Sequence, residues 1–179
     1  MSNDPRANAR LAGALWLVVI LVSVIAVATQ STQPRLAFAA TQFGAVCYLG
    51  VTVLLYQLFK PVNSSLALFA AVCGVTGVAS GIPDISSTNP VSQLSFLVEM
   101  VFFGFQILSI GYLITRSTLI PRALGVLLML GGASYVINSF TNFFDPTVGA
   151  HLMPFIVPIA VLGEGALTVW LLVKGVRVT

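Results

Sequence analysis

Residues 152–173, LMPFIVPIAVLGEGALTVWLLV, decide the fold class. The stretch carries a single charge, Glu164, and about 20 apolar residues in a helix cross the roughly 30 Å hydrocarbon core of a bilayer. The rest of the chain has the same character: 58% of its 179 residues are hydrophobic, 7% are charged and the mean hydropathy is +1.01. Soluble domains carry about 25% charged residues. The chain is therefore expected to be an integral membrane protein.

Six apolar stretches of this kind follow one another along the chain. They cover residues 11–29, 37–59, 66–82, 91–114, 123–140 and 152–173. Short segments with Pro, Gly, Asn or Asp separate them, and the stretches lack the strict alternation of a membrane β-barrel. In lipid only helices and closed β-barrels satisfy the backbone hydrogen-bonding groups, so we predict an all-α, polytopic bundle of six transmembrane helices. Residues 11–173 form one domain, with tails at residues 1–10 and 174–179.

The basic residues predict the orientation in the membrane. If the helices alternate in direction, seven basic residues lie on one side and only Arg35 lies on the other; the seven are Arg6, Arg10, Lys60, Arg116, Arg122, Lys174 and Arg177. Basic residues are enriched in cytoplasmic loops. Both termini are therefore expected in the cytoplasm and the loops with Asp84 and Asp145 outside. The net charge of +3 follows from this topology and requires no nucleic-acid partner.

Small and aromatic residues suggest how the helices pack. On the third stretch, Cys73, Gly77 and Gly81 recur every four residues, which favours close approach of a neighbouring helix. A homodimer motif is the weaker interpretation of the same spacing. Large aromatic residues near the cytoplasmic helix ends predict an interfacial belt; they are Trp16, Tyr56, Tyr112 and Trp170.

Polar residues on the last three stretches predict one interior pocket that opens outward. Glu99 and Gln106 share a face of the fourth stretch, seven residues apart. The fifth stretch has a polar stripe of Tyr135, Asn138 and Asn142. On the sixth, Glu164 follows Pro158, which is expected to bend the helix and act as a hinge.

The two glutamates are the candidate site residues. The helical rise of about 1.5 Å per residue puts Glu164 near the midplane and Glu99 in the outer third. No Lys or Arg lies within the six stretches, so each carboxyl is expected to be neutral and bonded to amides or hydroxyls. Either the glutamates form a protonatable site for transport or acid chemistry, or they make interhelical hydrogen bonds that fix the packing.

The sequence predicts neither a metal site nor a cofactor. His151 is the only histidine, and Cys47 and Cys73 stand alone, without a C-x-x-C pair. Nucleotide-binding and hydrolase motifs such as G-x-x-x-x-G-K-[ST] and G-x-S-x-G are absent from the sequence. ATP-driven transport by this chain alone is therefore excluded.

Several segments at the basic side resemble the DUF4386 family, bacterial multi-pass membrane proteins of unassigned function. The segments are residues 10–13 (RLAG), 60–63 (KPVN), 111–117 (GYLITRS), 120–125 (IPRALG), 162–164 (LGE) and 170–175 (WLLVKG). The resemblance implies a compact helical domain in a bacterial inner membrane. Glu164 matches the family's glutamate before the last W-L-L-x-K-G. Many members carry an arginine where this chain has Cys73 and Gly74, so the resemblance supplies no cation for Glu164.

Two functional classes remain open. The first is a module that binds or transports a small or lipid-like ligand, with Glu164 at the midplane. The second is a small membrane enzyme that uses an intramembrane glutamate as general acid on a lipid or isoprenoid. A structural or accessory subunit is a third interpretation. The sequence favours binding or transport over catalysis; membrane lipids are the expected partners, and six helices are compatible with a complete unit or with half of a homo-oligomer.

Overall fold

The computed structural model describes residues 4–81 and 90–177, and within these ranges all regular structure is helical. The six helices are α1 (Pro5–Thr29), α2 (Pro34–Phe59), α3 (Ser64–Ser80), α4 (Pro90–Arg116), α5 (Arg122–Phe144) and α6 (Pro146–Val173). The prediction of an all-α bundle of six helices is confirmed. Residue 82 of the third predicted stretch and the loop with Asp84 lie outside the described residues.

Five of the helices are long and apolar enough to cross a membrane, namely α1, α2, α4, α5 and α6. The remaining helix, α3, is apolar but has only 17 residues. At 1.5 Å per residue it is about 25 Å long, which is shorter than the roughly 30 Å hydrocarbon core. The protein is thus a multi-pass membrane protein with one short helix.

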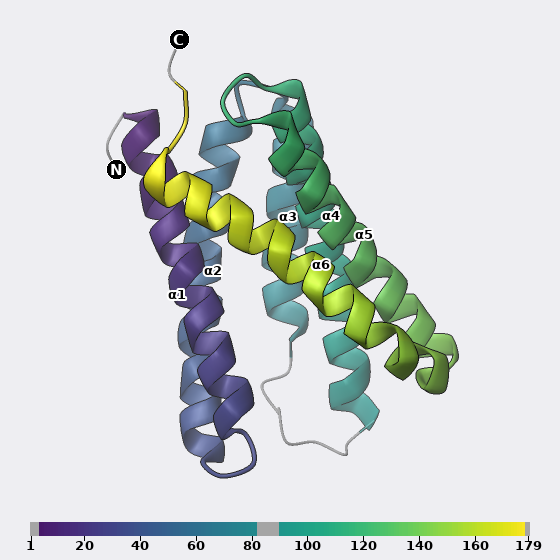
Figure 1. Cartoon of the computed structure of the whole chain (residues 1–179). Helices are drawn as coiled ribbons and strands as arrows, with labels where there is room; N and C mark the ends of the chain where they lie inside the picture. Colours follow the sequence, from purple (N-terminus) through teal and green to yellow (C-terminus); the bar gives the residue numbers. More distant parts are fainter. Residues whose placement is uncertain (1–3, 82–89, 178–179) are drawn as a thin grey trace.

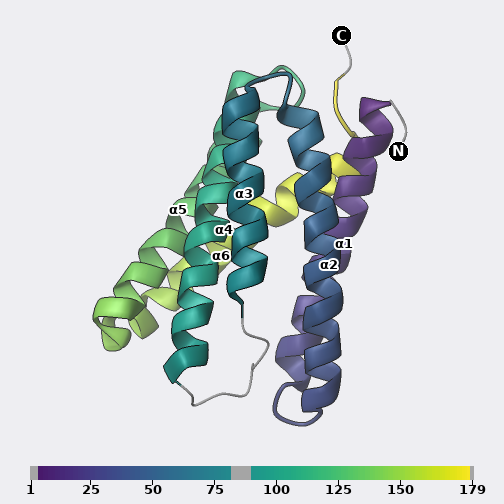
Figure 2. The same cartoon turned by 180° about the vertical axis from the view of Figure 1, so that it is seen from behind.

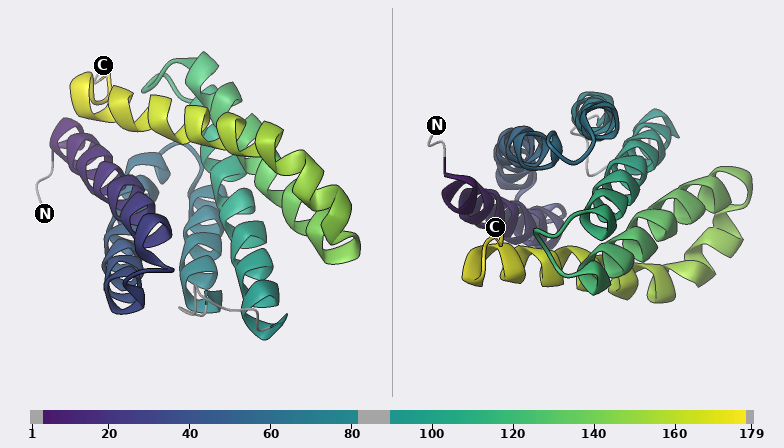
Figure 3. Two further views of the ribbon diagram at one scale, coloured as in Figure 1. Left: turned by 60° about the horizontal axis from the view of Figure 1, so that its bottom comes forward. Right: turned by 90° about the horizontal axis from the view of Figure 1, so that it is seen from above.

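Helix α6 packs against both α1 and α5. In Figure 1, α1 and α2 form an antiparallel hairpin on one side, while α3, α4 and α5 follow on the other side. Figure 2, from behind, shows α2, α3 and α4 in sequence. Seen from above in Figure 3, α6 runs across the bundle from α5 to α1, and it contacts both. The α1–α2 hairpin is therefore held to the other helices partly through α6.

The helix directions gather the basic residues at one end. Both termini lie at the top in Figure 1, together with the α2–α3 and α4–α5 connections, and the α1–α2 turn lies at the bottom. The seven basic residues predicted to share one side therefore lie at one end of the bundle, and Arg35, at the start of α2, lies at the other.

Carboxylate and amide side chains fix the starts of three helices. Asp4 accepts from the backbone N–H of Arg6 at 2.9 Å, so α1 begins at Pro5 and includes part of the predicted N-terminal tail. Asp145 accepts from the N–H groups of Thr147 and Val148, and α6 therefore begins at Pro146, ahead of the predicted residue 152. Asn63 caps α3 in the same way. Proline at the first helical position explains why α1 and α6 extend beyond their most apolar segments.

Paired glycines bring α4 and α5 into backbone contact. A Cβ on Gly132 would lie 2.7 Å from the carbonyl oxygen of Gly104, and one on Gly125 would lie 2.6 Å from that of Gly111. Both distances are too short for a real methyl group. The two helices thus touch at two points, one full heptad apart, where neither has a side chain.

Three glycines on α3 play a similar role against α4. Gly74, Gly77 and Gly81 lie beneath the side chains of Gln106, Phe103 and Glu99, in that order. Cys73 is buried on the same helix. The structure therefore places the predicted packing residues Gly77 and Gly81 at the α3–α4 contact, and it adds Gly74, which leaves room for Gln106.

We expect Gly132→Ala to destabilise the protein. Its methyl group would meet the backbone of α4, which cannot move aside as a side chain can, and over-packing of this kind costs about 1–3 kcal/mol. The free energy of unfolding in detergent measures the effect. Gly165→Ala is the matched control, because a Cβ there meets nothing within 4 Å. Equal stability of the two variants would contradict the glycine contact.

Candidate functional site

Glu164 lies where three helices meet. Its Oε1 accepts a hydrogen bond from the Tyr135 hydroxyl of α5 at 2.6 Å, and its Oε2 accepts one from the Trp16 indole N–H of α1 at 3.2 Å. Both donors are neutral, and no Lys or Arg occurs in the sequence between residues 123 and 173. Each oxygen of the carboxyl group is thus satisfied without a cation.

Glycines bring the backbones close enough for these bonds. A Cβ on Gly163 would lie 2.9 Å from the carbonyl oxygen of Leu127, so α6 rests directly on α5 next to Glu164. A Cβ on Gly13 would lie 2.9 Å from the Cβ of Leu171, so α1 approaches α6 one turn before Trp16. The side chains of Trp16 and Tyr135 therefore reach the same carboxyl group from opposite sides of α6.

A second polar cluster joins α2 to α4. The Tyr48 hydroxyl donates to Gln106 Oε1 at 2.8 Å, and Gln106 Nε2 donates to the Thr52 hydroxyl at 3.1 Å. All three side chains are buried. The Tyr48 ring also packs on Phe103, with 4.6 Å between ring centroids. Because a buried amide in lipid needs partners for its donor and its acceptor, this cluster satisfies Gln106 on both sides.

Five helices contribute polar side chains to the two clusters, and α3 contributes glycines beside the second one. We call these side chains together the polar region of the bundle.

Glu99 occupies the outer part of this region. Its partly buried carboxyl group lies against Gly81 at the end of α3. Glu99 precedes Gln106 by seven residues, about 10 Å along α4. The structure therefore places Glu99 and Gln106 on one side of α4, toward α3, as their spacing predicted.

Asn138 and Asn142 lie apart from Glu164. The Asn142 amide donates to the backbone carbonyl and the side-chain oxygen of Asn138, at 2.8 and 2.9 Å, and it lies against Gly149 at the start of α6. Fifteen residues of α6, about 22 Å, separate Gly149 from Glu164. Of the predicted stripe on α5, only Tyr135 contacts the glutamate, and the two amides satisfy each other beside the α5–α6 turn.

The prolines of α6 do not interrupt the helix. Pro154 and Pro158 both lie inside α6, which continues to Val173. Neither proline has an N–H to donate to the carbonyl four residues earlier, so two successive turns of α6 each lack one backbone hydrogen bond. A hinge at Pro158, six residues before Glu164, stays a prediction.

Sequence reasoning missed three residues of the site: Trp16, Tyr48 and Thr52. The assignment of Trp16 to an interfacial belt was wrong, because its side chain is only 2% exposed and bonds to Glu164. Tyr48 and Thr52 are four residues apart and share a face of α2. A search for polar stripes on the second stretch would have found them. For Trp16 the sequence offers one indication of burial against another helix, which is the small residue Gly13 one turn earlier.

The described residues contain no group of three His, Cys, Asp or Glu side chains that could hold a metal ion. Cys47 and Cys73 are buried and free. The described site offers one ionisable carboxyl group, Glu164, with hydrogen-bond donors from Tyr135 and Trp16.

Comparisons with known proteins agree with the resemblance noted from the sequence. The family model described as "Domain of unknown function (DUF4386)" matches residues 11–88 and 84–175. An uncharacterized protein of the archaeon Archaeoglobus fulgidus is 23% identical over 127 residues, which are 70% of this chain and 75% of that protein. No solved structure matches the chain.

We expect Tyr48→Phe and Gln106→Leu to be coupled in a double-mutant cycle. Their hydrogen bond is buried, and such interhelical bonds in membranes contribute about 0.6 kcal/mol on average and up to about 1.7. Unfolding free energies of the two single variants and the double variant give the coupling. Tyr48→Phe combined with Asn142→Ala is the control pair and should be additive. A coupling no larger than that of the control would contradict the observed bond.

Proposed function

The chain belongs to the DUF4386 family, a domain of unknown function, and we propose that it is a membrane module that binds or transports a small or lipid-like ligand through Glu164. The observation that carries the proposal is the setting of this acid. It is held by two neutral donors from two other helices, with no Lys or Arg on its own helix or on α5 beyond Arg122.

The carboxyl group of Glu164 can be ionised or neutral, and the two states make different hydrogen bonds. As a carboxylate it accepts both hydrogen bonds that the structure contains. As a neutral acid it carries an O–H donor on one of its two oxygens. With the proton on Oε1, the Tyr135 oxygen accepts it and the Tyr135 proton turns elsewhere; with the proton on Oε2, Oε1 still accepts from Tyr135 and the contact with Trp16 changes instead. Gain or loss of one proton therefore changes the contacts that tie α1 and α5 to α6. Ionisable residues inside membranes are costly and typically mark ion or substrate pathways.

Access to the acid supports binding. Glu164 and Tyr135 are only partly buried, whereas Trp16 is enclosed. A ligand with a hydrogen-bond acceptor or a cationic group can replace one of the two neutral donors. Glu99, further along the same polar region, is proposed as a second contact on this route.

The boundary between the α1–α2 hairpin and the helices α3–α5 is the proposed place of movement. Across it lie two hydrogen bonds, Tyr48 with Gln106 and Gln106 with Thr52, beside apolar contacts of α2 with α3, and α6 spans both sides. Among the described glycines, none contacts backbone across this boundary as Gly104 and Gly132 do between α4 and α5. Transporters commonly place their sites near the midplane between two such moving parts.

The basic end of the bundle is proposed to face the cytoplasm, in line with the distribution of Lys and Arg. Glu164 precedes Val173 by nine residues, so it lies about 13 Å from that end of α6. The membrane is proposed to be the cytoplasmic membrane, with both termini inside.

This topology predicts opposite labelling of two introduced cysteines. In a background without Cys47 and Cys73, Ser31→Cys in the exposed α1–α2 turn should react with an impermeant maleimide on intact cells. Thr118→Cys, exposed between α4 and α5, should react only after the cells are opened. The reverse pattern would overturn the orientation.

Trp16 is expected to report protonation of Glu164 through its fluorescence. The chain has two tryptophans, so Trp170→Phe leaves Trp16 as the single indole, hydrogen-bonded to the carboxyl group. In this background the emission of the purified protein should change with pH in a single transition. Adding Glu164→Gln should abolish the transition, and adding Glu99→Gln, which does not contact Trp16, should leave it in place. A transition that survives Glu164→Gln would contradict a titrating site.

The binding function itself is tested by what the purified protein retains. Native mass spectrometry, followed by extraction and identification of bound lipids and metabolites, should show a species that wild type and Asn142→Ala keep and Glu164→Gln loses. Unfolding curves establish that all variants are equally folded. If no species depends on Glu164 although the variants fold, Glu164 is a packing residue and the proposed function fails.

A further inference from the structure

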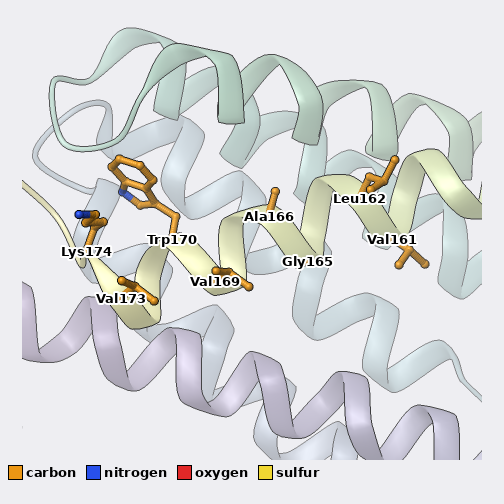
Figure 4. A pocket seen from close by; sticks show the side chains of 8 residues that line it. All are labelled: Val161, Leu162, Gly165, Ala166, Val169, Trp170, Val173 and Lys174. Carbon is orange, nitrogen blue, oxygen red and sulfur yellow. The ribbon is translucent and has the colours of Figure 1, made fainter.

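The outer face of α6 carries a groove that is separate from the Glu164 site. The groove has a volume of about 530 Å³, and its lining is apolar except at one end; the lining residues are Val161, Leu162, Gly165, Ala166, Val169, Trp170, Val173 and Lys174 (Figure 4). In Figure 4, Leu162, Ala166 and Trp170 stand on the side of α5, and Val161, Val169 and Val173 stand on the side of α1. The groove therefore runs lengthwise along α6.

Gly165 forms the floor of the groove. A Cβ at this position would meet nothing within 4 Å, which is not true of any other glycine in the described residues. Its neighbour Gly163 packs against the backbone of α5 instead. Because Glu164 bonds to Trp16 and Tyr135 in the interior, the two glycines and the acid between them separate an inner site from an outer groove.

The groove ends among basic residues. Lys174 lines its end and is exposed. Gly175 follows with a φ of 65°, a left-handed conformation that turns the chain back toward α1. A Cβ on Gly175 would lie 4.0 Å from Nε of Arg10, so the Arg10 guanidinium lies near the same end. Two cationic side chains from α1 and the end of α6 thus flank the end of an apolar groove.

The dimensions match one lipid chain. Val161 and Lys174 are 13 residues apart, or about 20 Å along the helix, and one leaflet of the hydrocarbon core is about 15 Å thick. An acyl chain that lies obliquely over Gly165 would therefore bring its glycerol phosphate to the level of Lys174.

We propose that this groove is a binding site for an anionic phospholipid, with one acyl chain over Gly165 and the phosphate at Lys174 and Arg10. The charge favours this occupant over a second copy of the chain. Two copies in the same membrane orientation, paired through this face by a two-fold axis, would bring Lys174 close to Lys174 of the other copy. Like charges in contact oppose such a pair, whereas a phosphate is attracted to the same position.

The test uses the full-length protein in nanodiscs of phosphatidylcholine with a minor fraction of phosphatidylglycerol. Native mass spectrometry after release from the disc counts the lipids of each class that stay bound. Wild type should retain phosphatidylglycerol about 25-fold in excess of its share of the bilayer, about fivefold for each of the two basic residues. Equal retention of both lipids would overturn the proposal.

Three variants locate the site. Gly165→Leu places a side chain in the groove at a position where its Cβ meets nothing within 4 Å, and it should reduce the retention of phosphatidylglycerol to its bulk share. Lys174→Gln should lower the preference about fivefold and leave the part due to Arg10, while Lys60→Gln, the matched control, should keep the wild-type preference. Lys60 lies at the same end of the bundle but stacks on Tyr56, away from the groove. A loss in Lys60→Gln equal to that in Lys174→Gln would show a general charge effect and overturn the site.

Two further readouts distinguish the alternatives. The Trp16 fluorescence transition should be unchanged in Gly165→Leu, which shows that the variant is folded and that the groove is independent of the Glu164 site. The mass of the wild-type particle should correspond to one chain. If wild type is a dimer that Gly165→Leu separates, the groove is a protein interface and the lipid proposal is wrong.

Discussion

Close approach of helix backbones is the constraint on which the rest of the structure depends. In lipid there is no hydrophobic force that pulls apolar helices together, so association relies on packing and on polar bonds between helices. The contacts between Gly104 and Gly132 and between Gly111 and Gly125 supply this packing between α4 and α5. Gly163 and Gly13 do the same for α6 against its two neighbours. Because the backbones are this close, the side chains of Trp16 on α1 and Tyr135 on α5 both reach Glu164 on α6.

The polar interior is a consequence of that approach. Gln106 could not lie between α2 and α4 if Gly74 had a side chain, since its amide occupies the space where a Cβ would be. Each polar group then satisfies another, so the interior tolerates an amide, three hydroxyls and a carboxylic acid without a single basic side chain among the hydrogen bonds described. Glu164 and Glu99 are the carboxylic acids of the region, and of the two only Glu164 accepts hydrogen bonds from two other helices, so the proposed function is assigned to it.

The sequence predicted the elements of this fold well and their contacts less well. Lengths of apolar stretches and the positions of Pro and Asp follow from the bilayer thickness and from backbone chemistry, both of which act locally. Which residues meet depends on how the helices tilt and rotate. The spacing of residues within a helix does not predict these angles, and it therefore did not predict that α6 crosses the bundle obliquely. Tyr135 was therefore expected to share one pocket with Asn138 and Asn142. In the structure the Tyr135 hydroxyl donates to Glu164, whereas the Asn142 amide donates to Asn138. Trp16 lies near the start of the predicted stretch at residues 11–29, but α1 begins at Pro5, so Trp16 lies in the middle of the helix, buried and bonded to Glu164 of α6.

The bond between Trp16 and Glu164 joins positions 148 residues apart in the chain. During synthesis α1 and α5 enter the membrane before α6, so the interior site does not exist until α6 is in place. Before that, Trp16 and Tyr135 are donors without their acceptor. Helix α6 then carries Glu164 into hydrocarbon, and donors already present in the membrane lower the cost of that step. The order of these helices in the chain therefore assists the insertion of Glu164.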